Sequence, residues 1–348
     1  MKRSKTEFTI LKAFNGDCIL IKTFNSQSDE FIILIDGGTP STFEYSLKPE
    51  LRNLSKIDLL VLTHIDSDHI GGLLKLFNNS LIDRIDISEI WVNNPDLINV
   101  NSGGLIGFDQ ANKFKDLIVQ KKGQAIIKEI STSERFIVRD NVFFTILSPT
   151  KDILDLLYQN WEYDKPKNNI KINVSSDTNI GSYEASLEEL SNKAFAPIKT
   201  IEQDIVNASS IAFILSCPDM IFLLLGDSRA EIVEKELSIL GYARETPLEC
   251  DYVKLSHHGS KNNTSENLLE LLNSTNYIIS TNGGSVINKH PSREVIAKIV
   301  YNAQRKIDEE LHIFMNYSVP EIKNRIGCFI NDNDLDNGDW TIEQKNNF

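Results

Sequence analysis

The sequence predicts an α/β fold, in which short buried strands alternate with amphipathic helices. Two observations support this class. Short apolar runs, such as 59–62 and 221–225, have the length and composition of buried strands. Several of them lead into segments with helical spacing of apolar residues, such as 73–77. A third observation is that polar loops with glycine directly follow the runs, as expected where strand ends meet at one edge of a sheet.

The first part of the chain is predicted to begin as an antiparallel sheet and to continue with alternating helices and strands. Apolar segments separated by Gly, Asp or Ser clusters indicate the opening strands, and Gly123 follows the second helix in the position typical of a helix end. In order, we expect strands at 7–14, 18–21 and 31–35, a helix at 42–53, strands at 59–62 and 89–93, a helix at 109–120, and strands at 125–130 and 142–147.

The middle of the chain changes character. Residues 150–205 are rich in Asn, Lys, Asp and Ser, with one expected helix near 151–158. We interpret this segment as an insertion, and 160–200 as a surface excursion that is a candidate substrate lid. It is also a candidate contact for a protein partner. The oligomeric state is left open.

The last part returns to alternating strands and helices. The expected elements are a hairpin at 210–215 and 221–225, helices at 230–240, 265–272 and 293–304, and strands at 251–255 and 277–280. We therefore predict one domain over 1–330, followed by an acidic, Asn-rich tail at 331–348 whose last dozen residues are expected to fray.

Composition limits the classes of protein. The 348 residues are 41% hydrophobic and 24% charged, which is ordinary for a soluble globular protein. No apolar run approaches the roughly 20 residues of a membrane span, and the basic start of the chain lacks the apolar stretch of a secretory signal. The four cysteines are scattered in or beside apolar runs without a CxxC pair, as in a reducing compartment. We therefore expect a cytoplasmic protein with no membrane contact.

The net charge of −13 bears on the substrate. Proteins that bind long duplex DNA through its backbone usually carry a basic stripe, because phosphate neutralisation supplies much of the affinity. No strong basic run is present, so tight nonspecific binding of polynucleotides is disfavoured. A local positive site made by metal ions remains compatible with this charge.

The most informative stretch is 63–72, where His64, Asp66, Asp68 and His69 directly follow an apolar strand and precede two glycines. A strand that fixes the start of a loop, with glycines that free its exit, can direct several ligands at one point. The chain has only six histidines, and two of them fall within this stretch. An incidental polar loop is therefore a poor explanation.

Three more strand ends carry side chains of the same kind. Asp36 and Asp227 each follow a buried run, and His257 and His258 follow another. A single Asp after a strand is usually a turn residue, but four such positions with glycine alongside predict one shared site. Since neighbours on an extended segment face opposite ways, we expect only one of His257 and His258 to bind a metal and the other to reach the substrate.

These pieces resemble the metallo-β-lactamase fold, and within it the branch of the ComEC-like competence proteins and the phosphorylcholine esterase. The matching segments, in the family's order, are 16–21, 33–38, 63–72, 207–211, 224–227, 254–261, 279–280 and 290–292. The resemblance implies an αββα sandwich of two mixed sheets flanked by helices, with one or two metal ions at one edge.

The resemblance also implies a set of metal ligands. His64 and Asp66 would bind one metal; Asp68, His69 and one of His257 or His258 would bind the other, with Asp227 bridging both. Asp36 would support the loop by holding its ligands in orientation. Asp68, His258 and His290 are the candidate catalytic residues. His290 is either an acid for the leaving group or a residue at a helix entry.

Two positions depart from the family pattern. Asp66 stands where the family at large has histidine, and Ser148 stands near the place of the usual third histidine. An added oxygen ligand and a missing imidazole shift the preference from zinc towards manganese or magnesium. Zn²⁺ and Mn²⁺ both stay open as cofactors, with one or two ions.

The chemistry expected of such a site is hydrolysis, and neither a Ser-His-Asp set nor a Walker-type loop competes with it. The prediction is a metal-dependent phosphodiesterase or nuclease acting on nucleic acid or a nucleotide. A phosphomonoester or other small-ester hydrolase is the second interpretation. The third is a low-activity subunit of this fold that acts with a partner, for example in a bacterial defence system.

Overall fold

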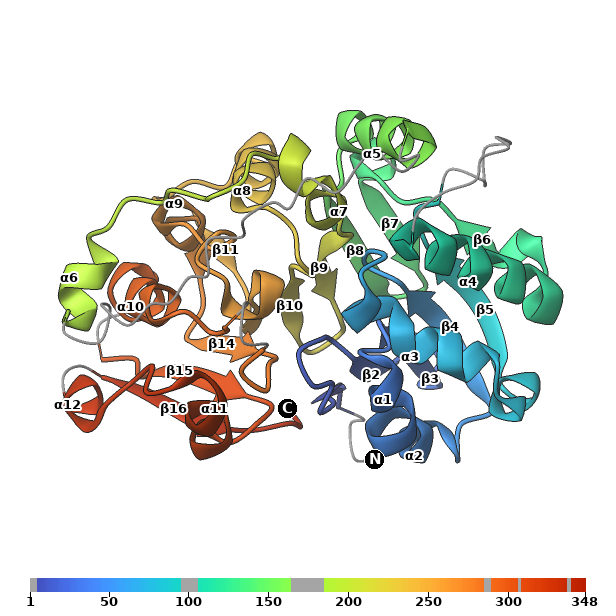
Figure 1. Ribbon diagram of the computed structural model, residues 1–348, viewed down its shortest axis with the longest axis horizontal. Helices are drawn as coiled ribbons and strands as arrows, with labels where there is room; N and C mark the ends of the chain where they lie inside the picture. The colour runs from blue at the N-terminus through green and yellow to red at the C-terminus, as the bar shows by residue number, and fades with distance from the viewer. Residues whose placement is uncertain (1–4, 95–105, 164–184, 285–288, 306–307, 337–338) are drawn as a thin grey trace.

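The computed structural model describes residues 5–94, 106–163, 185–284, 289–305, 308–336 and 339–348. It contains two large sheets, each covered by helices on its outer face (Figure 1). A small third sheet pairs β11 (Leu248–Glu249) with β13 (Leu272–Asn273). The predicted αββα class is confirmed.

The first sheet has the strand order β1-β2-β3-β4-β5-β6. Its first three strands are antiparallel, and β3, β4, β5 and β6 run parallel. The strands are β1 (Glu7–Ile10), β2 (Ile19–Phe24), β3 (Glu30–Ile35), β4 (Lys56–Val61), β5 (Asp86–Trp91) and β6 (Ile127–Lys128).

The second sheet has the order β16-β15-β14-β12-β10-β9-β8-β7. Strands β7 to β10 are antiparallel, and β10, β12, β14, β15 and β16 are parallel. The strands are β7 (Phe136–Arg139), β8 (Val142–Ser148), β9 (Ala212–Ser216), β10 (Ile221–Leu224), β12 (Tyr252–Lys254), β14 (Asn276–Ile279), β15 (Leu311–Met315) and β16 (Trp340–Gln344).

The core lies in three apolar layers. Between the sheets, aromatic rings from the two sides meet: Phe8 stacks on Phe222 at 4.6 Å, and Trp91 lies edge-on to Phe144 at 4.9 Å. The other two layers lie between each sheet and its helices. Because both sheets are buried on both faces over most of their strands, these strands appear in the sequence as continuous apolar runs.

The outer helices divide between the two sheets (Figure 1). The first sheet is covered by α1 (Pro40–Thr42), the π-helical turn η1 (Phe43–Leu47), α2 (Lys48–Leu51), α3 (Ser67–Phe77), α4 (Ile106–Lys122), α5 (Lys151–Tyr163) and α7 (Ile205–Ala208). The second is covered by α6 (Leu187–Ser191), α8 (Ala230–Ile239), α9 (Glu266–Glu270), α10 (Arg293–Asn302), α11 (Val319–Ile326) and α12 (Asp332–Leu335).

The C-terminal end differs from the expectation. Residues 339–348, the described part of the last dozen, do not fray: β16 pairs with β15, and Trp340 is buried. Phe348 exchanges backbone hydrogen bonds with Phe8 of β1, at 3.1 and 2.9 Å. The polar composition of this end concealed Trp340, which packs between the second sheet and its helices, and Phe348, which packs between the two sheets.

Two strand predictions also need correction. Residues 124–126 form a 3-10 turn, so the strand expected at 125–130 shrinks to β6. Strand β7 was not predicted, because it has only four residues and exposes Phe136 and Val138.

The expected insertion at 150–205 is described only in part, since residues 164–184 lie outside the described ranges. Its described end includes α6, which packs against α10. Leu187 and Leu190 of α6 are buried between the second sheet and its helices. The lid and partner expectations concern a segment that includes these undescribed residues. Within the part of the chain that the structure describes, no helix has the length and apolar character needed to span a membrane.

Candidate metal centre

The loop from β4 to α3 carries the first group of candidate ligands. Asp66 lies at the helix N-cap position with extended backbone (φ −64°, ψ 147°), and Asp68 and His69 fall in the first turn of α3. Gly72 lets this helix approach the turn after β3, because a Cβ there would lie 1.9 Å from the carbonyl oxygen of Gly37. The loop is therefore held against the end of β3, where Asp36 lies.

Asp36 holds this loop from behind. Its buried carboxylate accepts hydrogen bonds from the backbone N–H and hydroxyl of Thr63, both at 2.7 Å, and from Nδ1 of His69 at 2.7 Å. With Nδ1 donated to Asp36, the His69 ring directs its Nε2 to the other side, where that nitrogen could bind a metal ion. This is the geometry that the supporting role proposed for Asp36 requires.

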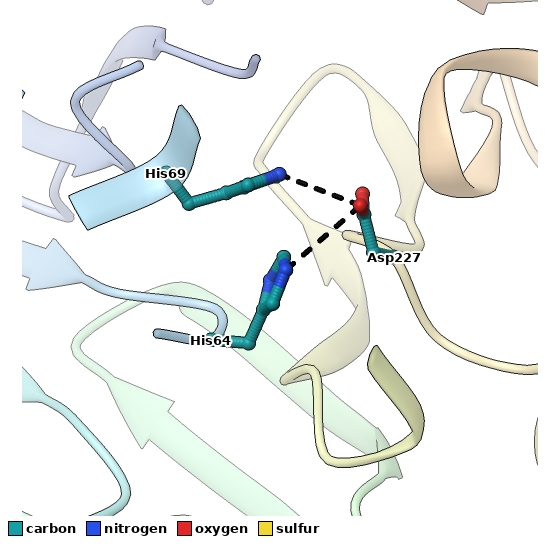
Figure 2. Close-up of side chains that lie close together, drawn as sticks. All are labelled: His64, His69 and Asp227. Atoms are coloured by element: carbon teal, nitrogen blue, oxygen red, sulfur yellow. Dashed lines mark ion pairs between the residues drawn. The ribbon is translucent and has the colours of Figure 1, made fainter. Parts of the chain in front are cut away.

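Asp227 follows β10 and lies at the centre of the site. Its Oδ2 atom lies 3.5 Å from Nε2 of His69 and 3.8 Å from Nε2 of His64 (Figure 2). The Nε2 atoms of His258 and His257 lie 3.6 and 3.8 Å from the same oxygen. Four imidazoles therefore converge on one buried carboxylate oxygen.

His257 and His258 do not lie on an extended segment, so the premise of that expectation does not hold, and the binding of a metal by only one of them stays a prediction. They lie in a short turn, η8 (Ser256–Gly259), with φ of 45° and 57° instead of extended backbone. This left-handed conformation directs both Nε2 atoms towards Asp227. The His258 Nδ1 donates to the carbonyl of Ser280 at 2.9 Å, and the His257 Nδ1 donates to Oδ1 of Asn263 at 3.2 Å.

The two remaining carboxylates of the motif border the cluster. The Oδ2 of Asp68 lies 3.9 Å from Nε2 of His258 and accepts a hydrogen bond from Asn15 at 2.8 Å. The Oδ2 of Asp66 lies 3.6 Å from Nε2 of His64, and its side chain is 49% exposed. Asp66 is thus at the solvent side of the cluster.

Two functional candidates were missed from the sequence. The buried carboxylate of Asp17 forms an ion pair with the buried ammonium of Lys254, and its Oδ1 lies 3.5 Å from Nδ1 of His258. Burial alone would raise the pKa of Asp17, but the Lys254 charge reverses this and holds the pKa below its usual range. The available signal was that each residue lies inside a matching segment, Asp17 in 16–21 and Lys254 in 254–261.

The ring of His290 lies 5.4 Å from that of His257 and 6.4 Å from that of His258. Its Nδ1 is buried without a hydrogen-bond partner among the described residues. Burial, reinforced by the two neighbouring histidines, holds the pKa of His290 well below its usual range. The ring is therefore neutral at pH 7.

The place of the family's usual third histidine offers no imidazole. Ser148 is buried at the end of β8, and its hydroxyl donates to the carbonyl of Ala208 at 3.3 Å. His257 is instead the fourth imidazole beside Asp227.

The donor atoms fit a divalent metal ion. Nε2 of His64, His69 and His258 and Oδ1 of Asp227 are buried without a hydrogen-bond partner in the described structure. Such orphaned groups are costly unless something satisfies them. His64, His69 and Asp227 form one set of ligand atoms lying within 4.8 Å of one another, and Asp68, His69 and His258 form another. Imidazole and carboxylate together suit zinc and manganese.

Comparison with known proteins gives one family match and several remote similarities. Residues 11–134 match the family model of the metallo-β-lactamase superfamily. ComE operon protein 3 of Bacillus subtilis (strain 168) is 21% identical over 278 residues, which are 80% of this chain and 26% of that protein. The chain thus spans about a quarter of the length of that relative.

Several solved structures are also similar. A diphosphatase from the PhnP family has 12% identity and a TM-score of 0.38, over 88% of this chain and 99% of that one. CmlA, a diiron β-hydroxylase from Streptomyces venezuelae, has 11% identity and a TM-score of 0.37, over 99% and 54%. Zn²⁺-bound PqqB from Methylobacterium extorquens has 9% identity and a TM-score of 0.38, over 94% and 85%.

The layered fold and the cluster of metal-capable residues are those that the resemblance implied, and residues 11–134 match the superfamily model. The family match covers about a third of the 348 residues, so the superfamily is what this chain is similar to.

Proposed function

We propose that this protein is a metal-dependent phosphodiesterase that acts on nucleic acid or a nucleotide ester. The observation that carries the proposal is the set of four imidazole Nε2 atoms, each 3.5–3.8 Å from Oδ2 of Asp227. Three of these nitrogens are buried without another hydrogen-bond partner among the described residues. The choice of phosphodiester follows from the ComEC-like pattern of the sequence motifs.

The ligands would be His64, Asp66, Asp68, His69, Asp227, His257 and His258, with Zn²⁺ or Mn²⁺ as the ion. A divalent ion bound there would lower the pKa of water and stabilise the charge of a reacting phosphoryl group. Asp227 would serve both halves of the site, because its Oδ2 lies within 3.8 Å of imidazoles from both.

The chain's own residues orient this centre and handle protons. Asp36 fixes the tautomer and the orientation of His69, and the Ser280 carbonyl does the same for His258. Asp68 borders the cluster beside His258. His290 is neutral and offers a buried Nδ1 without a partner in the described structure, so its ring would accept a proton or a hydrogen bond from a group bound in the centre and would not act as an acid for the leaving group.

The test is the hydrolysis of bis-p-nitrophenyl phosphate by metal-stripped protein, with Mn²⁺, Zn²⁺ or Mg²⁺ added back in turn. We expect turnover that depends on the ion and that Asp68→Ala abolishes. The matched control is Asp83→Ala, because Asp83 is an exposed carboxylate paired with Lys121 away from the site. Turnover that persists without metal, or in Asp68→Ala, would contradict the proposal.

Two other functions keep specific support. The net charge of −13 and the lack of a basic run favour a small substrate, and hence a phosphomonoester or other small ester. The turned-away Ser148 hydroxyl favours a weakly active subunit that works with a partner, a role for which the 150–205 insertion is the candidate contact. Faster turnover of p-nitrophenyl phosphate than of the diester would support the first function. Absence of bound metal after reconstitution would support the second.

A further inference from the structure

A pair of aromatic side chains lies beside the candidate metal centre without a role in the site described above. Phe14 is half-buried in the loop between β1 and β2, and Tyr45 of η1 is 77% exposed. Their ring centroids lie 6.4 Å apart in an edge-to-face arrangement (66°). The neighbours of Tyr45 in η1, Phe43 and Leu47, are buried and anchor the turn, so packing of η1 does not account for the tyrosine.

Phe14 is held in a strained backbone conformation. Its φ is 62°, in the left-handed region that a bulky side chain rarely adopts. Such strain persists only where the surroundings determine the conformation, and it concentrates at functional sites. The position of the Phe14 ring is therefore imposed by the fold.

Neighbouring elements fix this loop by hydrogen bonds to its backbone. The N–H of Phe14 donates to the Tyr317 hydroxyl at 2.8 Å, and the carbonyl of Phe14 accepts from the N–H of Asn282 at 2.8 Å. The hydroxyl of Ser46, next to Tyr45, donates to the carbonyl of Lys12 at 2.6 Å. The Ser46 bond joins the loop to η1, and the ring contact places Phe14 and Tyr45 side by side on one surface.

The same loop touches the metal centre directly. Asn15 donates to Oδ2 of Asp68 at 2.8 Å. Gly16 packs so closely that a Cβ on it would lie 1.7 Å from the carbonyl oxygen of Asp68. The strained aromatic residue is thus one position away from a residue that contacts a candidate catalytic carboxylate.

We propose that Phe14 and Tyr45 form a stacking subsite for a planar aromatic group of the phosphoester, of the nucleobase class. The inference rests on the proposed phosphodiesterase function and names the part of the substrate recognised beside the centre. Aromatic side chains bind bases through their faces, largely independently of base identity. Such a subsite would supply affinity that the acidic chain does not obtain from basic contacts to phosphates.

The experiment compares two diesters with the same leaving group: thymidine 5′-(p-nitrophenyl phosphate) and methyl p-nitrophenyl phosphate. The readout is the ratio of their kcat/KM values in metal-loaded wild type, Tyr45→Ala and Phe14→Leu. We expect the ratio, thymidine ester over methyl ester, to fall about tenfold in Tyr45→Ala and in the same direction in Phe14→Leu. Tyr301→Ala is the matched control, because Tyr301 is 45% exposed at the end of α10, and it should keep the wild-type ratio.

An unchanged ratio in both variants would overturn the subsite. If wild type hydrolyses neither ester, the proposed function fails, and equilibrium dialysis with thymidine 5′-monophosphate tests the subsite alone. Binding about tenfold weaker in Tyr45→Ala than in wild type supports it. Equal binding, or no binding by wild type, overturns it.

Discussion

The two halves of the metal centre are built in different ways. The first half comes from the β4–α3 loop, whose backbone is regular and whose His69 is held by the carboxylate of Asp36. The second half comes from η8, where two consecutive histidines have positive φ and His258 is held by the carbonyl of Ser280. Behind His258 lies the buried ion pair of Asp17 and Lys254.

This difference shows that an imidazole can be oriented towards Asp227 either by a carboxylate behind its ring or by the backbone conformation of its turn. In the first half, a negative charge behind the imidazole orients the ring and raises its basicity. In the second half, the charge behind the ring is balanced by an ammonium, and the backbone conformation sets the direction. The orientation of the imidazole should therefore depend on the carboxylate of Asp36 in the first half, and on the ion pair of Asp17 and Lys254 in the second half.

The largest effect is expected where the halves meet, at Asp227. In Asp227→Asn the carboxylate that faces all four imidazoles loses its charge, so activity should fall to that of metal-stripped protein. Diester hydrolysis across a metal series measures this. Asp251→Asn is the control, because Asp251 is an exposed residue whose carboxylate accepts a hydrogen bond from the N–H of Ile221. Activity close to wild type in Asp227→Asn would show that the halves do not share this group.

The second effect concerns stability. Lys254→Met leaves the Asp17 carboxylate buried without its partner and should cost about 3–5 kcal/mol of unfolding free energy. Urea unfolding of the metal-stripped protein measures it. The double variant Asp17→Leu/Lys254→Met removes both charges and should recover most of the loss. If the double variant were no more stable than Lys254→Met, the loss of unfolding free energy would not come from the unpaired Asp17 charge.

A smaller effect, on metal affinity, is expected at Asp36, which supports His69 in the first half of the centre. Asp36→Asn keeps the shape of the side chain but removes the charge behind His69, so metal affinity should fall about 10–100-fold. Competition with a chromogenic chelator gives the affinity. Unchanged affinity would mean that the Thr63 contacts, and not the charge, hold the loop.

The smallest effect is expected at the histidine outside the cluster. His312 lies on β15 with its Nδ1 bonded to Thr341, and no metal-capable group includes it among the described residues. His312→Ala should change the unfolding free energy by about 0.5 kcal/mol or less and leave metal binding as in wild type. Loss of bound metal in this variant would point to a second site.

The contrast between the halves also explains what the sequence could predict. The strand-to-helix loop follows ordinary geometry, so the spacing of His64, Asp66, Asp68 and His69 was enough to predict that they share one edge of the sheets. The turn at His257 and His258 could not be anticipated, since two consecutive non-glycine residues with positive φ depend on tertiary packing.

The other failures have similar causes. Asp17 and Lys254 are separated by 237 residues, and each is unremarkable in its own segment, so their pairing required the fold. The last strand was hidden by its polar neighbours, although Trp340 and Phe348 supply its apolar contacts. The periodicity of apolar residues predicts a local helix or strand well, but it does not reveal which distant segment packs against that element.

The most direct test of the shared centre is calorimetric titration of metal-stripped protein with Zn²⁺ and with Mn²⁺, beside Asp227→Asn. We predict that wild type binds one or two ions per chain and that the variant loses this binding while remaining folded by circular dichroism. Wild-type protein that binds neither ion, or a variant that binds as wild type does, would contradict the assignment of Asp227 and the histidines as a metal centre.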